Sequence, residues 1–311
     1  MTGGRIVIAG GTGLIGRALA GKWSSDGVEV VVLSRGLIEV AGARRVTWDA
    51  QSAGEWVSVI DGASAVINLS GFPVIHRWTA DNKRIMRDSR VLSTRAIGEA
   101  IAACQAPPQT WINASAVGYY GDTGAREVSE ATRAGEGFLP EMCQEWEQEV
   151  DDADVGETRR VKLRIGVVLA RDGAFVKQLS SITKAFLGSA VGSGEQYISW
   201  IHIDDVVRII DWCLESGLSG ALNAVAPEPV TNAAMMAEFR RILKRRALPK
   251  PPTPVIRAVA WLRRMEPELL LTGQKVRSEI ALANGFRFKF ASLRLALEDL
   301  LAVPETVPTG N

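Results

Sequence analysis

Three evenly spaced glycines between a predicted strand and a predicted helix constrain this chain more than any other feature. The run Arg5–Ala9 leads directly into Gly10, Gly13 and Gly16, and a helix is predicted from Leu14. At such a junction the first glycine permits a tight turn, the second lets backbone N–H groups approach a pyrophosphate, and the third allows close helix packing. A glycine pattern alone also fits a simple turn, but here strand, glycines and helix coincide. The segment therefore predicts a dinucleotide-binding loop with contacts from Gly10, Thr12, Gly13, Leu14, Ile15 and Gly16.

Short apolar runs alternate with amphipathic segments through the first half of the chain. Strands are predicted at Val28–Leu33, Ala65–Leu69 and Thr110–Ala114, and a long helix at Ala80–Ala103. This alternation is typical of α/β proteins and predicts a doubly wound parallel sheet of the Rossmann type. The long helix has an apolar face that is expected to pack on the sheet. This face contains Ile85, Val91, Leu92, Ile97 and Ile101.

The second half of the chain continues the alternation and then becomes helical. Helices are predicted around Phe138–Asp151 and Phe175–Leu187, and strands at Arg159–Leu169, Tyr197–Ile203 and Ala221–Ala224. Asp204 or Asp205 is expected to cap the helix that ends at Leu214, because carboxylates are good N-caps. After Pro229 the helical pattern is interrupted by prolines, which predicts a smaller, mainly helical C-terminal lobe.

The length of 311 residues exceeds that of a usual single domain. We expect a cofactor-binding Rossmann domain at residues 1–170, with its sheet completed by parts of 195–226. A substrate lobe is expected at 171–303, including a helical domain from about residue 249, and a disordered tail at 304–311.

Composition excludes several other classes of protein. Hydrophobic residues make up 47% of the chain, and 36 lysines and arginines nearly balance 35 aspartates and glutamates, so no nucleic-acid partner is expected. Three scattered cysteines and two histidines argue against a disulfide framework and against a metal site. No run reaches the ~20 apolar residues of a membrane span, and no signal peptide is recognised. We expect a cytoplasmic protein with a small-molecule substrate and no membrane partner, and association as a homodimer is left open.

The end of the second predicted strand indicates which dinucleotide is bound. Ser34 and Arg35 stand where NAD-specific folds usually present a carboxylate to the ribose 2′-hydroxyl. Arg35 suits a 2′-phosphate because its guanidinium is planar and permanently charged, although a surface arginine after a strand is the alternative. Asp49, after the third strand, is placed beside the adenine or only caps a turn. The chain is therefore expected to bind NADP(H) in preference to NAD(H).

Further motifs follow in the order found in extended short-chain dehydrogenase/reductases. They are Asn68–Gly71, Ser115–Gly121, Arg164–Leu169 and Ser199–Asp205. A second set is similar to a more specific group and comprises Arg77–Trp78, Ser89–Val91 with Thr94, Asn223–Pro227, and Leu269–Leu271 with Gly273–Gln274. This group is the epimerase-like family with a C-terminal domain of unknown function, which the chain resembles over about residues 5–301.

The resemblance implies a Rossmann sheet, a small C-terminal substrate lobe and a set of NADP contacts. Those contacts fall on Ser34, Arg35, Leu69, Ser70 and Arg90. Leu69–Gly71 follows a strand at the carboxyl edge of the sheet, where backbone can approach the cofactor riboses. Arg90 on the next helix can reach a phosphate, with a solvated helix face as the alternative. Gly71 and Arg164 complete the expected cofactor set.

The catalytic pair usual in this family is missing. Extended members use a serine with Tyr-x-x-x-Lys, in which the lysine lowers the tyrosine pKa and holds the ribose. The three tyrosines here are Tyr119, Tyr120 and Tyr197, and none has a lysine four residues later. In the corresponding predicted helix, Cys143 takes the tyrosine position and Glu147 the lysine position. The standard proton relay is therefore absent, and Cys143 is interpreted as a packing residue.

The remaining catalytic candidates are Ser115, Tyr119, Tyr120 and Glu147. Ser115 competes with Ala116 for the serine position, depending on how the double tyrosine is aligned. We expect proton transfer from Tyr119 or Tyr120 together with Ser115, because these side chains follow the fifth strand at the ligand edge of the sheet. Glu147 is the alternative, as a buried general base.

Two functions fit these observations. The first is an NADP-dependent epimerase or oxidoreductase acting on a small polar or nucleotide-linked substrate, in a cleft between the sheet and the C-terminal lobe. The second, favoured by the missing Tyr-x-x-x-Lys pair, is a non-catalytic module that binds NADP(H) or senses its redox state.

Overall fold

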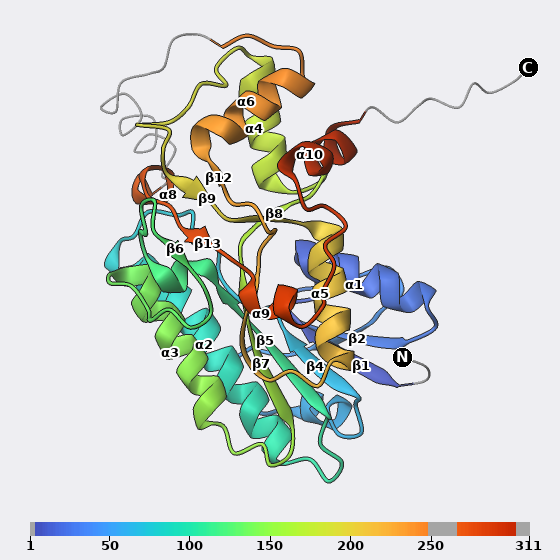
Figure 1. Cartoon of the computed structure of the whole chain (residues 1–311). Helices are drawn as coiled ribbons and strands as arrows, with labels where there is room; N and C mark the ends of the chain where they lie inside the picture. The colour runs from blue at the N-terminus through green and yellow to red at the C-terminus, as the bar shows by residue number, and fades with distance from the viewer. Residues whose placement is uncertain (1–3, 248–265, 303–311) are drawn as a thin grey trace, which may run out of the picture.

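A computed structural model describes residues 4–247 and 266–302. Its centre is a seven-stranded parallel sheet in the order β11-β7-β5-β4-β1-β2-β3 (Figure 1). These strands are β1 (Arg5–Ala9), β2 (Glu29–Ser34), β3 (Arg44–Thr47), β4 (Ala65–Asn68), β5 (Thr110–Ala116), β7 (Arg159–Ile165) and β11 (Gly220–Ala224). The predicted doubly wound α/β fold is confirmed.

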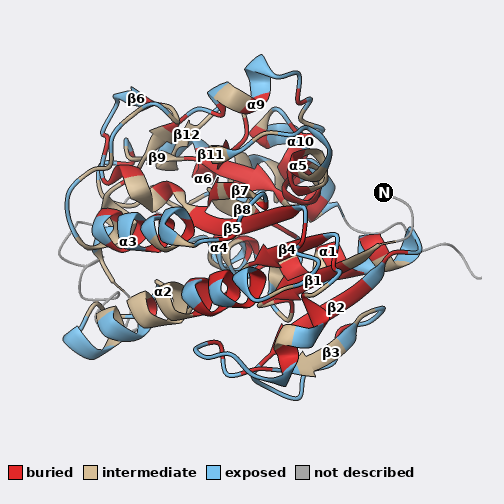
Figure 2. Cartoon of the chain, turned by 90° about the horizontal axis from the view of Figure 1, so that it is seen from below, coloured by how far each residue is buried: buried red, intermediate tan, exposed pale blue. Residues whose placement is uncertain are grey.

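Helices cover both faces of the sheet. α1 (Leu14–Ser25) and α5 (Ile203–Glu215) lie on one face, and α2 (Ala80–Ala102) and α3 (Phe138–Asp152) lie on the other (Figure 1). Ile8 belongs to the core under the first pair and Val7 to the core under the second, because successive strand side chains point to opposite faces. Figure 2 shows the strands buried between helices whose outer faces are exposed. Burial on both faces explains why the strands read as continuous apolar runs.

The C-terminal lobe has its own small core. α4 (Ala174–Lys184), α6 (Asn232–Ile242) and α10 (Leu293–Leu301) pack around Trp200, Phe239 and Leu297. The remaining short helices are η1 (Glu55–Val59), η2 (Val117–Tyr120), α8 (Glu268–Leu271) and α9 (Glu279–Ala283). Three pairs of short strands lie outside the main sheet: β8 (Val167–Leu169) with β10 (Trp200–His202), β9 (Tyr197–Ile198) with β12 (Val230–Thr231), and β6 (Glu127–Val128) with β13 (Lys275–Val276).

The boundaries predicted for the two domains stay a prediction. The tail predicted at 304–311 and part of the helical domain predicted from about 249 lie outside the described residues.

Two predicted strands are wrong as single elements. The run 159–169 divides at Gly166 into β7, which lies in the main sheet, and β8, which pairs with β10. A Cβ at Gly166 would lie 2.5 Å from the Ser199 carbonyl oxygen, so only glycine allows the two segments to approach there. The run 197–203 likewise divides into β9 and β10.

The predicted cap of α5 is also wrong. The helix begins at Ile203, and the N-cap is His202, whose Nδ1 accepts a hydrogen bond from the Asp204 backbone N–H at 3.1 Å. Asp205 instead accepts from the backbone N–H groups of Lys289 and Phe290, each at 2.8 Å. The Asp205 carboxylate, predicted to cap the helix locally, therefore binds the backbone of a distant C-terminal segment.

Residues 4–247 and 266–302 contain neither a membrane-spanning helix nor a cluster of metal-binding side chains. No helix there combines the length and apolar character needed to cross a bilayer. No cluster of three or more histidine, cysteine, aspartate or glutamate side chains there has an arrangement suited to a metal ion.

Candidate functional site

A cavity of about 470 Å³ opens at the carboxyl edge of the sheet, beside β1. The sheet order changes direction at β1, which lies between β2 and β4, so the loops that follow these strands diverge and leave a crevice. Of the residues predicted to bind the cofactor, the cavity wall contains Gly10, Thr12, Gly13, Ser34, Arg35, Asp49, Leu69, Ser70 and Gly71. The others, Leu14, Ile15, Gly16, Arg90 and Arg164, are not part of this wall.

The glycine loop owes its shape to three different constraints. Gly10 has a φ of 72°, and a Cβ there would lie 2.8 Å from the Leu69 carbonyl, so any side chain is strained and blocked. A Cβ at Gly16 would lie 2.4 Å from the Gly11 Cα, which places Gly16 in a packing role. Gly13 differs, because the nearest atom to its Cβ position is the Gly10 carbonyl oxygen at 3.3 Å. The open face of Gly13, at the N-terminus of α1, leaves room for a ligand to approach the backbone.

The end of β2 presents a hydroxyl and a guanidinium to the same cavity. Ser34 Oγ accepts a hydrogen bond from the Gly36 backbone N–H at 3.2 Å, which fixes the turn that carries exposed Arg35. In the part of the chain that the structure describes, no carboxylate lies within salt-bridge distance of Arg35. Asp49 lies across the cavity and caps its own turn, since its carboxylate accepts from Ser52 Oγ at 2.5 Å and from the Gln51 backbone N–H at 2.9 Å. The hydrogen bonds from Ser52 hold the pKa of Asp49 below its ordinary value.

Ser70 and Arg90 carry buried polar atoms that have no partner among the described residues. These atoms are Ser70 Oγ and Arg90 Nε. Arg90 Nη1 donates to two backbone carbonyls, at 2.9 and 3.0 Å, and the guanidinium lies 5.1 Å from the ring centre of Trp146. Burial lowers the pKa of Arg90 to about 10. A Cβ at Gly71 would lie 3.1 Å from the Arg90 guanidinium carbon, so a side chain there would require this arginine to shift by a few tenths of an ångström.

One wall of the cavity was missed by the sequence analysis. It is formed by Arg84, Ile85, Asp88, Ser89 and Leu92 of α2. Ile85 was assigned to the packing face of this helix, but it is 38% exposed. The spacing of Ile85, Ser89 and Leu92 by four and three residues was the available signal, because residues so spaced share one helix face.

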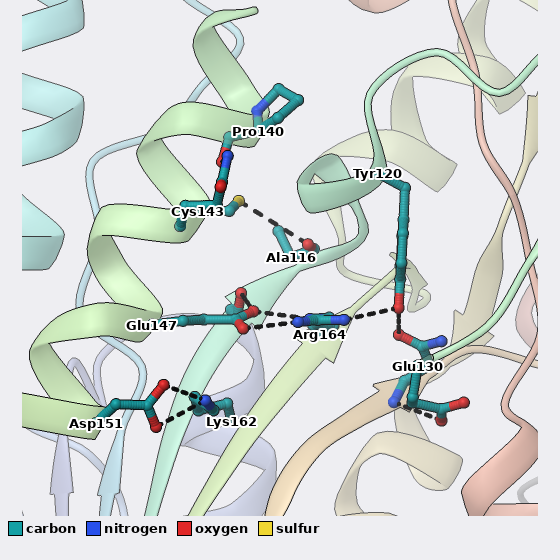
Figure 3. A network of polar contacts seen from close by, with 12 residues as sticks. Ala116, Tyr120, Glu130, Pro140, Cys143, Glu147, Asp151, Lys162 and Arg164 are labelled. Carbon is teal, nitrogen blue, oxygen red and sulfur yellow. Dashed lines mark hydrogen bonds and ion pairs between the residues drawn. The ribbon is translucent and has the colours of Figure 1, made fainter. Parts of the chain in front are cut away.

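Three of the four catalytic candidates, Ser115, Tyr120 and Glu147, lie in one buried network, of which Figure 3 labels Tyr120, Glu147 and Arg164. Ser115 Oγ donates to Glu147 Oε1 at 2.6 Å, and Arg164 donates to both carboxylate oxygens at 2.8 Å. Arg164 Nη1 also donates to the Tyr120 hydroxyl at 3.0 Å, and that hydroxyl donates to Asn223 Oδ1 at 2.8 Å. All five residues are buried. Burial raises the pKa of Tyr120 above its ordinary value despite the neighbouring Arg164.

The two positions of the missing catalytic pair are filled by groups with structural contacts. Cys143 is fully buried, with Sγ 3.9 Å from the Ala116 carbonyl oxygen, and burial raises the pKa of its thiol to about 12. Glu147, one turn along α3, is the carboxylate that Arg164 neutralises. Neither residue can replace a tyrosine whose pKa is lowered by a lysine.

Tyr119 is the candidate that this network leaves accessible. Its ring is half-buried and stacks on Arg164, whose guanidinium carbon lies 3.5 Å from the ring centre. Among residues 4–247 and 266–302, no group forms a hydrogen bond with the Tyr119 hydroxyl. Its orientation is therefore set by the ring stacking, and its hydroxyl is available to a ligand.

Comparisons with known proteins agree with this architecture. Residues 6–138 match the model of the NAD dependent epimerase/dehydratase family, and residues 251–300 match the domain of unknown function DUF1731. Epimerase family protein ML0860 of Mycobacterium leprae is 36% identical over 294 residues, which cover 94% of each chain. A crystal structure of the human epimerase family protein SDR39U1 with NADPH is 33% identical, has a TM-score of 0.84, and is matched over 95% of this chain and 98% of that chain.

A solved structure described as a nucleoside-diphosphate sugar epimerase from Corynebacterium glutamicum is also similar. It is 29% identical with a TM-score of 0.78, and the match covers 96% of this chain and 58% of that one. The family resemblance found in the sequence motifs is thereby confirmed. This chain belongs to the same epimerase family as these relatives, and it joins a NAD dependent epimerase/dehydratase region to a DUF1731 domain.

Proposed function

We propose that this chain binds NADP(H) in the cavity beside β1 and uses it in epimerase-like or oxidoreductase chemistry on a small polar or nucleotide-linked substrate. The observation that carries the proposal is the convergence of the glycine loop, Ser34–Arg35 and Leu69–Gly71 on one cavity. The human relative crystallised with NADPH and the bacterial relative described as a nucleoside-diphosphate sugar epimerase support the cofactor and the substrate class.

The residues present fit the cofactor on three independent grounds. The open face of Gly13 at the start of α1 suits a pyrophosphate, because unpaired N–H groups and the helix dipole both favour an anion. Ser70 Oγ and Arg90 Nε offer hydrogen bonds that no residue in the described ranges completes. Arg35, with no carboxylate beside it in the described residues, suits the 2′-phosphate.

The chemistry that the chain itself can contribute is a proton from Tyr119. When bound, the dinucleotide supplies or accepts a hydride. Ser115 and Tyr120 have their hydroxyl protons committed to Glu147 and Asn223, so they are not ready donors. Tyr119 has a ring held in place by Arg164 and a hydroxyl without a hydrogen-bond partner among the described residues, so it can donate to a substrate oxygen and recover the proton from solvent.

The proposal is tested first by binding and then by turnover. We expect NADPH to bind more tightly than NADH in calorimetry at fixed salt, and bound NADPH to lose its nicotinamide absorbance when a fractionated metabolite extract is added. The Tyr119→Phe variant should bind NADPH normally and lose the oxidation, whereas Tyr197→Phe, on β9, should keep both. Equal affinities for the two cofactors would contradict the binding proposal, and full activity in Tyr119→Phe would contradict the assignment of the proton donor.

A second candidate function is a non-catalytic NADP(H)-binding module. The specific observation in its favour is that Cys143 and Glu147 fill the two catalytic positions with a protonated thiol and an ion-paired carboxylate. This function predicts tight NADPH binding with no oxidation in any metabolite fraction.

A further inference from the structure

The buried network fixes the direction of every hydrogen bond within it, starting at Ser115. Glu147 is ion-paired with Arg164 through two bonds of 2.8 Å, so its carboxylate oxygens only accept. Ser115 Oγ lies 2.6 Å from Glu147 Oε1 and must therefore donate its single proton to it. The Ser115 hydroxyl keeps its lone pairs and has no proton left to offer.

The other end of the network has a fixed direction for the same reason. Arg164 can only donate, so the Tyr120 hydroxyl accepts from it and donates to Asn223 Oδ1. The amide orientation of Asn223 is set in turn by its Nδ2, which donates to the Arg277 carbonyl at 2.8 Å. The polarity is thus anchored at both ends, and reversing the bond of Ser115 would require the ionised Glu147 carboxylate, which has no proton, to donate.

A count of lone pairs identifies what the network can still bind. Glu147 Oε1 already accepts from Ser115 and from Arg164 Nε, whereas, within the described part of the chain, Oε2 accepts only from Arg164 Nη2. Each carboxylate oxygen has two acceptor positions, so one remains on Oε2, and Ser115 Oγ has its own. The capacity left at Ser115 and Glu147 is therefore acceptor capacity, and it calls for a ligand that donates.

These acceptors lie where the far half of an extended dinucleotide would reach. Ser115 on β5 is directly beside Arg164 on β7, at the carboxyl ends of both strands. The strand order from Arg35 runs β2-β1-β4-β5, and three spacings of ~4.8 Å give a reach of ~14 Å along the edge of the sheet. A cofactor with its 2′-phosphate at Arg35 and its pyrophosphate at Gly13 extends toward β5.

We propose that Ser115, oriented by Glu147, accepts a hydrogen bond from a ribose hydroxyl of the nicotinamide half of the cofactor. This inference rests on the proposed NADP(H) binding. In the family pattern a lysine ammonium at the Glu147 position donates to that ribose. Here the polarity is reversed, because the chain supplies the acceptor and the ribose supplies the proton. Ser115 is then a cofactor-binding residue, and Glu147 and Arg164 are positioning residues.

The test compares a whole cofactor with a fragment that lacks the ribose in question. Ser115→Ala should weaken NADPH by about fivefold to tenfold, the loss expected for one hydrogen bond, while adenosine 2′,5′-bisphosphate binds as it does to the unmodified chain. Ser115→Thr keeps the hydroxyl and should restore NADPH affinity. Ser93→Ala, which removes another buried serine hydroxyl, one that bonds to backbone carbonyls of its own helix, should change neither affinity.

A second measurement alters the cofactor and begins with the unmodified chain. The unmodified chain should bind NADPH analogues lacking the 2′- or the 3′-hydroxyl of the nicotinamide ribose, and one of the two should show the same loss as Ser115→Ala. That analogue should lose nothing further on Ser115→Ala, since the two changes remove one bond. Normal binding of both analogues, or equal weakening of NADPH and the bisphosphate by Ser115→Ala, would overturn the inference. Failure of the unmodified chain to prefer NADPH over NADH would instead overturn the proposed function.

Discussion

Removing the charge of Glu147 should destabilise the fold far more than an identical change two residues away. The Glu147 and Arg164 side chains are 7% and 5% exposed, and Glu147→Gln leaves the arginine charge buried without its partner. Breaking such a pair costs about 3–5 kcal/mol, roughly a 10²- to 10⁴-fold change in the unfolding equilibrium. Urea unfolding followed by tryptophan fluorescence measures this loss directly. Glutamine keeps one carbonyl oxygen that can accept from Ser115, but its NH2 group then faces the Arg164 guanidinium, donor against donor, so the loss should fall at the upper end of that range.

Glu149→Gln is the matched control. Glu149 lies on the same helix and is paired with Arg95 at 2.6 Å, but the side chains are 22% and 51% exposed, so solvent screens the pair and the loss should be at most about 1 kcal/mol. Replacing Glu147 and Arg164 together by methionine should recover most of the stability, because no uncompensated charge then remains. Equal losses for Glu147→Gln and Glu149→Gln would refute the view that burial, and not the presence of a salt bridge, sets the magnitude.

Three further outcomes are expected. Gly13→Val should abolish NADPH binding in calorimetry with little change in urea unfolding, because a Cβ at Gly13 meets only the Gly10 carbonyl oxygen, at 3.3 Å. Gly16→Val, in contrast, should unfold the chain. Retained NADPH affinity in Gly13→Val would mean that the loop is merely a turn. Arg35→Asp should reverse the preference between NADPH and NADH, since a carboxylate repels the 2′-phosphate and accepts from the ribose hydroxyl, and an unchanged ratio of dissociation constants would count against Arg35 as the selecting residue. Burial raises the pKa of the Cys143 thiol to about 12, so Cys143 should resist iodoacetamide in the folded chain near neutral pH and react after unfolding. Mass spectrometry of the peptides measures the labelling, and labelling of native Cys143 at the rate of half-exposed Cys104 would contradict this prediction.

Local pattern predicted the frame of the site but not its chemistry. The glycine loop and the end of β2 could be read from the sequence because strand, turn and helix follow one another within a few residues. The partners in the Ser115, Glu147 and Arg164 network lie 32 and 17 residues apart along the chain. Their contact depends on the neighbouring positions of β5 and β7 and on the rotation of α3, which no periodicity encodes. For the same reason the sequence offered Tyr119 and Tyr120 as equals, and only their different burial separates them.

The predictions for the N-cap of α5 and for the exposed face of α2 were wrong for a related reason. Asp205 has the composition and position of a local helix cap, but tertiary contacts with Lys289 and Phe290 use its acceptor capacity. Ile85 fits a packing stripe, but α2 extends beyond the sheet, and there the stripe faces a cavity instead of a core. In both cases the local signal identified the right residue type and the surrounding fold decided its role.

The short pairing of β13 with β6 bears on the order in which this chain can fold. It brings Lys275 to Thr123, which is 152 positions earlier, where its backbone N–H donates to the threonine hydroxyl. The Arg277 carbonyl likewise completes the hydrogen bonds of Asn223, and through it those of Tyr120. Contacts of such high sequence separation form late, because the entropy of closing the loop must be offset before they contribute. On a ribosome, the sheet can therefore be complete before Lys275 and Arg277 have emerged, and the hydrogen bonds of Asn223 and Thr123 with these residues form only afterwards.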